Sequence, residues 1–286
     1  MELIMEKMSK DIKEAVKTLD RNSARYLVDI FYQVQEYRKA SYNQVRKLTK
    51  EEELEPDSML KYVAQNFEML ENEIKKALKI YVQQQPIGQW LLSIAGIGEV
   101  LAAGLIANID INKCETAGAI WRFAGLDPTM EWNKGEVRPF NARLKTLCWK
   151  IGESFVKVSN NDKDFYGKIY KERKEYEQAK NDAGEYAEQA REKLEKYKIG
   201  KDTEAYKYYS IGQLPPAHIQ SRAKRYAVKW FLSHLFEIWY IIEHNQMPPK
   251  PYAIAILGHA HYQEPPFLEQ VIQENNLDAN LLKNFR

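Results

Sequence analysis

Two glycines, Gly96 and Gly98, separate two apolar segments within residues 93–106, and this pattern could form a phosphate-binding site. Glycine has no Cβ, so it adopts positive φ angles and lets a partner approach the backbone closely. A helix that begins after Gly98 has unpaired amide groups in its first turn, and these amides and the helix dipole attract phosphate. The backbone of Gly96, Ile97 and Gly98 is therefore typical of a helix-hairpin-helix, a module that holds the DNA backbone without reading bases. The alternative is a tight turn between two helices packed in a helical core.

Lysines and arginines in two later segments could provide further phosphate contacts. The first group lies in and after an irregular stretch, and the second occupies the first turns of a helix expected over residues 218–244. Positive side chains near a helix N-terminus oppose the helix dipole, so the second group favours an anionic partner, with an ordinary surface patch as the alternative. The candidate contacts to the DNA backbone are Lys134, Arg138, Arg143, Lys145, Arg222, Lys224 and Arg225.

A His-x-His pair in the C-terminal tail has the spacing of metal ligands on a strand. His259 and His261 would point to one side, and His218, His234 or His244 could fold near them as a third ligand. A hydrogen-bonded pair in a loop is the alternative. Nothing else in the sequence supports a divalent metal, so we predict no cofactor.

The composition limits the classes of protein to which the chain can belong. The 286 residues carry a net charge of +2, so any basic surface must be local. The two cysteines form neither a metal-spaced pair nor a disulfide framework. No apolar run reaches the ~18 residues of a membrane span, and the chain starts with a charged helix rather than a secretory signal. We therefore expect a cytoplasmic protein that contacts no membrane.

The first segment, residues 1–85, carries apolar side chains at steps of three and four, which predict long amphipathic helices. A break lies at residues 55–58, where Asp57 or Ser58 could cap the second helix. Two such helices form either an antiparallel hairpin or a dimerising coiled coil. We therefore expect a homodimer that forms through these helices.

Three further segments follow, and helices are expected in each of them. Residues 86–159 contain the glycine hairpin, and residues 160–216 are rich in tyrosine, lysine and glutamate. Tyrosines and lysines of this charged insertion could clamp a nucleic-acid strand, or the tyrosines could cover the stem of a solvated helix. Residues 217–286 form a closing basic helix and a tail. The expected fold class is all-α.

The order of two motifs resembles the C-terminal domain of the IS110 group of insertion-sequence transposases. The first motif runs from Ile94 to Asp110 and contains the Gly-Ile-Gly hairpin, and the second is Ala-Gly-Leu-Asp-Pro at residues 124–128. In that family a hairpin of this kind precedes a Gly-Leu-x-Pro turn and a basic helical segment, which corresponds here to residues 141–144. The resemblance covers about residues 85–176 and 218–240, and it implies DNA binding, DNA recombination and a mobile element.

The chain departs from the family pattern at two points that concern catalysis. Family members begin with a RuvC-like domain that carries four acidic metal ligands on β-strands, whereas residues 1–85 are expected to be helical and resemble the coiled-coil linker of the family. Family members also place a nucleophilic serine in the loop after the Gly-Leu-x-Pro turn. The loop at residues 129–135 contains no serine. Thr129 is its only hydroxyl, and the sequence shows no evident base to activate it.

These observations favour a DNA-binding protein that holds duplex or branched DNA, or RNA, through backbone contacts and has lost strand transfer. One alternative is an active transposase or recombinase that uses a hydroxyl nucleophile together with a partner. Another is a structural or assembly protein of a mobile element or virus, which the long N-terminal helices and the tyrosine-rich insertion favour. The sequence leaves enzymatic activity without support.

Overall fold

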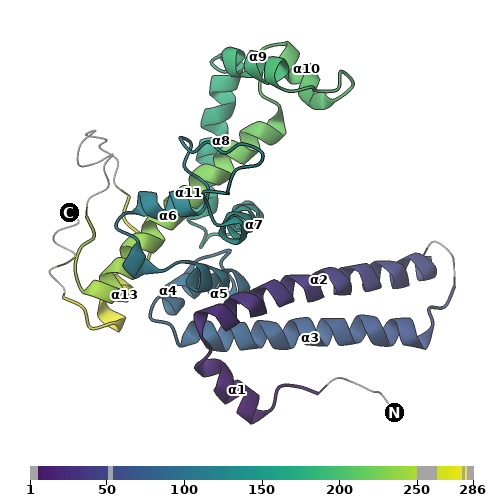
Figure 1. Ribbon diagram of the computed structural model, residues 1–286, viewed down its shortest axis with the longest axis vertical. Coiled ribbons are helices and arrows are strands. Elements are labelled where there is room, and N and C mark those ends of the chain that lie inside the picture. Colours follow the sequence, from purple (N-terminus) through teal and green to yellow (C-terminus); the bar gives the residue numbers. More distant parts are fainter. Residues whose placement is uncertain (1–5, 51–53, 250–262, 279–280, 282–286) are drawn as a thin grey trace. The chain divides into compact units, whose positions relative to one another are not determined.

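The computed structural model describes residues 6–50, 54–249, 263–278 and 281, and all regular elements in this part of the chain are helices (Figure 1). The prediction of an all-α fold is confirmed. Contacts between residues divide the chain into two compact units, one made of residues 1–93 and 97–113, the other of residues 94–96 and 114–286. No helix among the described residues is both long enough and apolar enough to cross a membrane.

The first unit is built on an antiparallel pair of long helices, α2 (Arg21–Lys50) and α3 (Ser58–Gln83), with the short helix α1 (Lys10–Lys17) packed on α3 (Figure 1). Asp57 caps α3 by accepting a hydrogen bond from the amide of Met59, as the sequence predicts. The buried side chains of α2 recur at steps of three and four, which places them on the side of the helix that packs within the unit, against α3 and α5: Ala24, Val28, Phe31 and Val34.

Helix α4 (Gly88–Ser93) leads through the glycine turn into α5 (Glu99–Asn108), which packs against both α2 and α3. Almost every side chain of α5 is buried, so the helix has no polar face. Arg21 of α2 closes its C-terminal end, because the guanidinium donates to the carbonyl of Ile109 and pairs with the carboxylate of Asp110 at 3.1 Å. The packing on α2 and α3 and the contacts of Arg21 at the C-terminal end therefore fix the position and direction of α5 within the first unit.

The second unit is organised around the long helix α11 (Pro216–His244), which contacts four shorter helices (Figure 1). These are α6 (Ala117–Phe123), α7 (Ala142–Val158), α8 (Tyr166–Asp182) and α13 (Leu268–Glu274). Aromatic rings fill the centre of the unit. Phe155 stacks on Tyr166 at 5.1 Å between ring centroids, and both rings meet Phe231 of α11 edge to face.

The remaining helices are η1 (Ile111–Lys113) in the first unit, and α9 (Ala187–Lys196) and α10 (Glu204–Ser210), which pack on each other in the second. Helix α8 packs along α11. Tyr166, Tyr170 and Tyr186 of the charged insertion are buried, so these three rings cannot stack on a nucleic-acid strand. The hypothesis of a tyrosine clamp is wrong for them, because their rings contribute to the core.

Candidate nucleic-acid interface

The start of α5 has an open phosphate-binding geometry. Gly98 is the N-cap residue, it is exposed, and no side chain caps the helix. Its carbonyl accepts a hydrogen bond from the amide of Ala102 at 2.9 Å, the first such bond of the helix. The preceding amides, those of Glu99, Val100 and Leu101, have no acceptor among the described residues. Such amides are the groups that bind phosphate at helix N-termini.

Gly96 and Ile97 support this turn rather than opening it. Gly96 has φ +92°, and its carbonyl accepts a hydrogen bond from Ser154 Oγ at 2.6 Å. A Cβ at this position would lie 3.2–3.3 Å from Val158, Phe155 and Ser154, which is tighter than ordinary packing. The side chain of Ile97 is buried, which leaves its backbone as the only part that could meet a ligand.

A charged pair lies beside the open amides. Glu99 is the first residue of α5, and its carboxylate is 3.8 Å from Nζ of Lys75 on α3. The carboxylate of Glu99 interacts favourably with the helix dipole and would compete with a phosphate for the amides. Lys75 offsets the negative charge of Glu99 and could itself bind the phosphate. Lys75 was missed in the sequence, because 24 residues separate it from Glu99 and only the packing of α3 on α5 brings them together.

In the second unit, the loop between α6 and α7 and the first turn of α7 carry alternating aromatic and cationic side chains. The guanidinium of Arg138 lies 5.2 Å from the ring centroid of Trp132 and 5.8 Å from that of Phe140. Lys145 follows Phe140 in the sequence, and its ammonium lies 4.1 Å from the centroid of the Phe140 ring. We call Trp132, Arg138, Phe140 and Lys145 the cation–aromatic ladder; its contacts are cation–π interactions.

Positive charges from distant parts of the second unit gather around this ladder. Burial lowers the pKa of Lys145, and the positive charges of Arg138 and of Arg225 on α11 lower it further. Burial also lowers the pKa of Lys229, where Asp127 opposes the shift and Arg225 adds to it. Like charges that destabilise one another's protonated state form a positive potential suited to an anion.

The two other cations predicted for this region are exposed. Lys134 lies at the turn of the loop and Arg143 in the first turn of α7. The structure therefore brings Arg138, Lys145 and Arg225 together and adds Lys229, which the sequence analysis did not single out. The aromatic neighbour of Lys229 is Trp121, whose ring centroid is 5.1 Å from Nζ.

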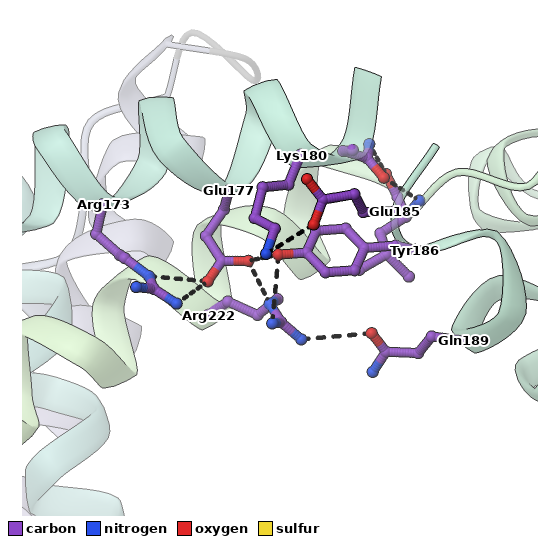
Figure 2. A network of polar contacts seen from close by, with 9 residues as sticks. Arg173, Glu177, Lys180, Glu185, Tyr186, Gln189 and Arg222 are labelled. Carbon is purple, nitrogen blue, oxygen red and sulfur yellow. Dashed lines mark hydrogen bonds and ion pairs between the residues drawn. The ribbon is translucent and has the colours of Figure 1, made fainter. Parts of the chain in front are cut away.

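Arg222 takes part in a buried network instead (Figure 2). The carboxylate of Glu177 on α8 is 1% exposed and accepts hydrogen bonds from Nε of Arg222 and the hydroxyl of Tyr186, both at 2.6 Å. Arg173, one turn earlier on α8, donates to the other carboxylate oxygen at 2.6 and 2.8 Å. A further bond of 3.4 Å joins Arg222 to Gln189 on α9. The network ties α8, α9 and α11 together.

Internal carboxylates thus account for two of the predicted cations on α11. Arg222 pairs with Glu177, and Lys224 pairs with Glu153 on α7. The argument that the basic first turns of α11 favour an outside anion does not hold for these two residues, because each already has an anionic partner. Arg225, the third predicted cation of α11, is exposed.

Thr129 has a neighbour that the sequence did not reveal. Its hydroxyl donates to Oδ1 of Asp127 at 2.7 Å, and its amide donates to the same oxygen at 2.9 Å. These two bonds lower the pKa of Asp127, which is therefore ionised at neutral pH. The sequence shows no evident base beside Thr129, and the structure adds the carboxylate of Asp127 as the acceptor of the hydrogen bond from its hydroxyl.

The proposed histidine pair, His259 and His261, lies outside the described residues. His234 is buried and uses both ring nitrogens, since Nδ1 is 2.9 Å from the hydroxyl of Tyr166 and Nε2 is 2.9 Å from the carbonyl of Gln263. Burial lowers its pKa to about 4, so the ring is neutral with the proton on Nε2. The described residues contain no group of three His, Cys, Asp or Glu side chains that could hold a metal.

Comparison with known proteins gives one match. The model of the Transposase IS116/IS110/IS902 family matches residues 88–166. The matched stretch begins with α4, contains α5, α6 and α7, and ends at the first residue of α8. No curated protein and no solved structure matches the chain.

The two glycines of the turn should respond differently to the same substitution. We expect Gly96→Ala to lower the free energy of unfolding by about 1–3 kcal/mol, because a side chain is strained at this φ and crowded by α7. Gly98→Ala should change it by less than about 0.5 kcal/mol, since φ is −91° and no atom lies within 4 Å of a Cβ. Urea unfolding of both variants measures the difference; equal losses would contradict the geometry of the turn.

Replacement of the buried carboxylate should remove part of the acid sensitivity. Burial alone raises the pKa of Glu177, but the hydrogen bonds from Tyr186, Arg222 and Arg173 outweigh it, so the pKa lies below the ordinary value of 4.5. The stabilisation is then complete above pH 4.5 and is lost as the pH falls through the lower value in the folded protein. We expect Glu177→Gln to cost about 1–3 kcal/mol at neutral pH and less in acid.

The measurement is urea unfolding of wild type and variant between pH 7 and pH 3. The exposed Glu188 of α9, whose contact with Arg191 is 3.6 Å long, provides the matched control as Glu188→Gln. A stability difference for Glu177→Gln that does not change with pH would mean that the carboxylate charge contributes nothing to the fold.

Proposed function

Because residues 88–166 carry a domain of the IS116/IS110/IS902 transposase family, we propose that this chain is a DNA-binding protein that holds the DNA backbone through a helix-hairpin-helix. The observation that carries the proposal is the open start of α5, where an exposed N-cap glycine precedes three unpaired amides. The chain is related to insertion-sequence transposases and hence to mobile elements. As a protein that acts on DNA, it would work in the cytoplasm.

The chemistry of the α5 start suits a phosphodiester better than a base. Amides and the helix dipole recognise charge and the shape of phosphate oxygens, and they carry no information about sequence. Lys75 provides a side-chain cation within reach of the same amides, because it already lies 3.8 Å from the carboxylate of Glu99. Binding of this kind would be independent of sequence and sensitive to salt.

A second contact with DNA is proposed for the basic residues of the second unit. The positive charges of Arg138 and Arg225 lower the pKa of Lys145, and Lys134 and Arg143 are exposed cations of the same segment. Each phosphate that such a side chain neutralises releases condensed counterions, so the logarithm of the affinity falls by roughly 0.9 for each tenfold rise in salt per contact. The contacts suit duplex or branched DNA, and RNA offers the same phosphates.

The proposal includes no strand transfer. The loop at residues 129–135 contains no serine, and its only hydroxyl belongs to Thr129. Hydrogen bonds from the hydroxyl and the amide of Thr129 to Asp127 Oδ1 form a local turn, and the carboxylate accepts from both. This arrangement stabilises the loop and requires no reaction.

The same hydrogen bond favours a second candidate function, an active recombinase. In this reaction Asp127 would remove the proton of Thr129 and the Thr129 oxygen would attack phosphorus, while the P–O bond to the adjoining nucleotide breaks and its deoxyribose oxygen leaves. A nicked suicide substrate distinguishes the two candidates. The first candidate predicts no covalent protein–DNA adduct on a denaturing gel. An adduct that forms with the wild type and is absent in Thr129→Val would establish the second.

We also propose that the chain forms a homodimer through α2. Tyr26 and Ile30 are exposed, and their spacing of four residues puts them on one side of the helix, whereas the exposed Tyr37 stacks on Phe67 of α3 at 5.6 Å between ring centroids. The buried apolar residues Val28, Phe31 and Val34 of α2 are already used within the first unit, where α2 packs on α3 and α5. An exposed apolar stripe on a long helix is suited to a second copy of the same helix.

Introduction of a carboxylate at the N-cap of α5 should block DNA binding without unfolding the protein. The backbone of Gly98 has φ −91° and ψ 178°, which an aspartate N-cap adopts, and a Cβ there meets no atom within 4 Å. We expect Gly98→Asp to keep or raise the melting temperature, because its side chain can accept a first-turn amide. The same side chain occupies the amides and repels phosphate, so the affinity for duplex DNA should fall about tenfold or more.

Gel shifts with a 30-base-pair duplex over a salt series measure this effect. Gly98→Asn keeps the cap without the charge and should give an intermediate affinity. Thr203→Asp places the same charge at the N-cap of α10, where Thr203 already accepts the amide of Tyr206, and should leave the affinity unchanged. Wild-type affinity for Gly98→Asp would exclude the hairpin as the DNA contact, and absence of wild-type binding at low salt would refute binding of duplex DNA.

The dimer makes an independent prediction. Light scattering of the wild type should give twice the chain mass of 33.5 kDa at micromolar concentration. Ile30→Glu should give the single mass, because it places a charge in the exposed stripe, whereas Asn43→Glu on the other side of α2 should leave the dimer intact. A monomeric wild type, or a dimer that Ile30→Glu leaves unchanged, contradicts the proposal.

A further inference from the structure

The tryptophan at the end of the cation–aromatic ladder is both exposed and held in place. Trp132 is 43% exposed, and its indole Nε1 donates to the carbonyl of Glu136 at 3.0 Å. The residues between them form a tight turn, in which the amide of Glu136 donates to the carbonyl of Asn133 at 3.2 Å and Gly135 has φ +96°. The ring is therefore fixed by its own loop while much of its surface meets solvent.

Two other residues of the ladder, Arg138 and Phe140, contact the Trp132 ring. Arg138 lies over the Trp132 ring, and Phe140 meets it at 6.4 Å with its plane turned by 77°. The ring of Phe140 packs against Gly125, where a Cβ would come within 2.8 Å of the ring, so this packing requires a glycine at position 125. The loop thus holds an aromatic surface with cations directly beside it, and both are in position before any ligand arrives.

We propose that Trp132 is a stacking platform for an unpaired base of a DNA strand, with Arg138 and Lys145 binding the adjoining phosphates. Bases in single strands stack on exposed aromatic rings, and cations beside the ring follow the backbone of the same strand. The inference deepens the proposed DNA binding and rests on it. It assigns the ladder to single-stranded segments, such as those in gaps, flaps and branched junctions.

The hydrogen bonding of the ring decides between recognition by stacking and recognition by base edges. The indole N–H is the only hydrogen-bonding group of the Trp132 side chain, and the carbonyl of Glu136 already accepts it. The platform therefore binds any base without reading it. A duplex keeps its base faces covered by neighbouring pairs, so an intact duplex should not use Trp132 at all.

Fluorescence anisotropy with a labelled 12-nucleotide oligo-dT tests the proposal on the full chain. We expect Trp132→Ala and Trp132→Leu to weaken oligo-dT binding about tenfold or more, and Trp132→Phe, which keeps an aromatic face, to weaken it less than about threefold. Affinity for a blunt duplex of 30 base pairs should change less than about twofold in all three variants.

The matched control is Tyr197 on α9, which is 49% exposed and lies 4.8 Å from Nζ of Lys193. Tyr197→Ala should bind oligo-dT like the wild type, because this second cation–aromatic pair belongs to no ladder. Melting temperatures of all variants confirm that the fold is intact. Trp132→Leu separates loss of stacking from loss of apolar bulk.

The outcomes separate this inference from the proposed function. Unchanged oligo-dT affinity in Trp132→Ala and Trp132→Leu, with normal duplex binding, overturns the platform and leaves the helix-hairpin-helix intact. Oligo-dT binding that depends on Trp132 in a protein that ignores duplex DNA supports the platform and refutes the hairpin. Tighter binding of oligo-U than of oligo-dT, lost in Trp132→Ala, would assign the platform to RNA and overturn the choice of DNA.

Discussion

Helix α5 buries side chains on every side, and this burial fixes the one end of the helix that stays open. Its apolar residues pack against α2 and α3, and Arg21 closes its last turn through Ile109 and Asp110. The first turn has no comparable partner, because glycine at position 98 provides no capping side chain. A rigid helix with an uncapped, accessible start is suited to a charged ligand, since the amides need no rearrangement to receive it. The proposed contact with DNA depends on this constraint.

The cationic side chains of the second unit fall into two groups, which differ in whether an internal carboxylate pairs with them. Arg173 and Arg222 surround the buried carboxylate of Glu177, and Lys224 pairs with Glu153. These cations hold α8, α7 and α11 together. The positive charges of Arg138 and Arg225 instead lower the pKa of Lys145, so this part of the unit has a local positive potential suited to an anion. The net charge of +2 conceals this division.

The helices and several of their boundaries could be predicted from the sequence, because these signals are local. Asp57 and Thr116 cap the helices that follow them, and Gly125 adopts a positive φ after α6. The open turn at Gly98 was also predicted, since glycine spacing is visible in the chain itself. Local patterns of this kind depend on residues within about one helical turn of each other.

Pairings between helices could not be predicted, because they depend on how each helix is rotated against its neighbour. Arg222 and Glu177 are 45 residues apart, and nothing near either residue indicates the other. The contact of Lys75 with Glu99 is hidden for the same reason. Two other contacts join residues that are close in the sequence, within the loop of residues 126–141. They are the hydrogen bond of Thr129 to Asp127 and the contact of Arg138 with Trp132. Their spacings of two and six residues carry no regular period, so no helical or strand pattern reveals them.

Amide hydrogen exchange at the start of α5 tests the central claim most directly. Exchange rates of the Glu99, Val100 and Leu101 amides would be measured with and without an excess of duplex DNA at low salt, with the first-turn amides of α10 as an internal reference. The account predicts that DNA slows exchange at these three amides and leaves the α10 amides unchanged. Binding of DNA that leaves the exchange of all three amides unaltered would contradict it.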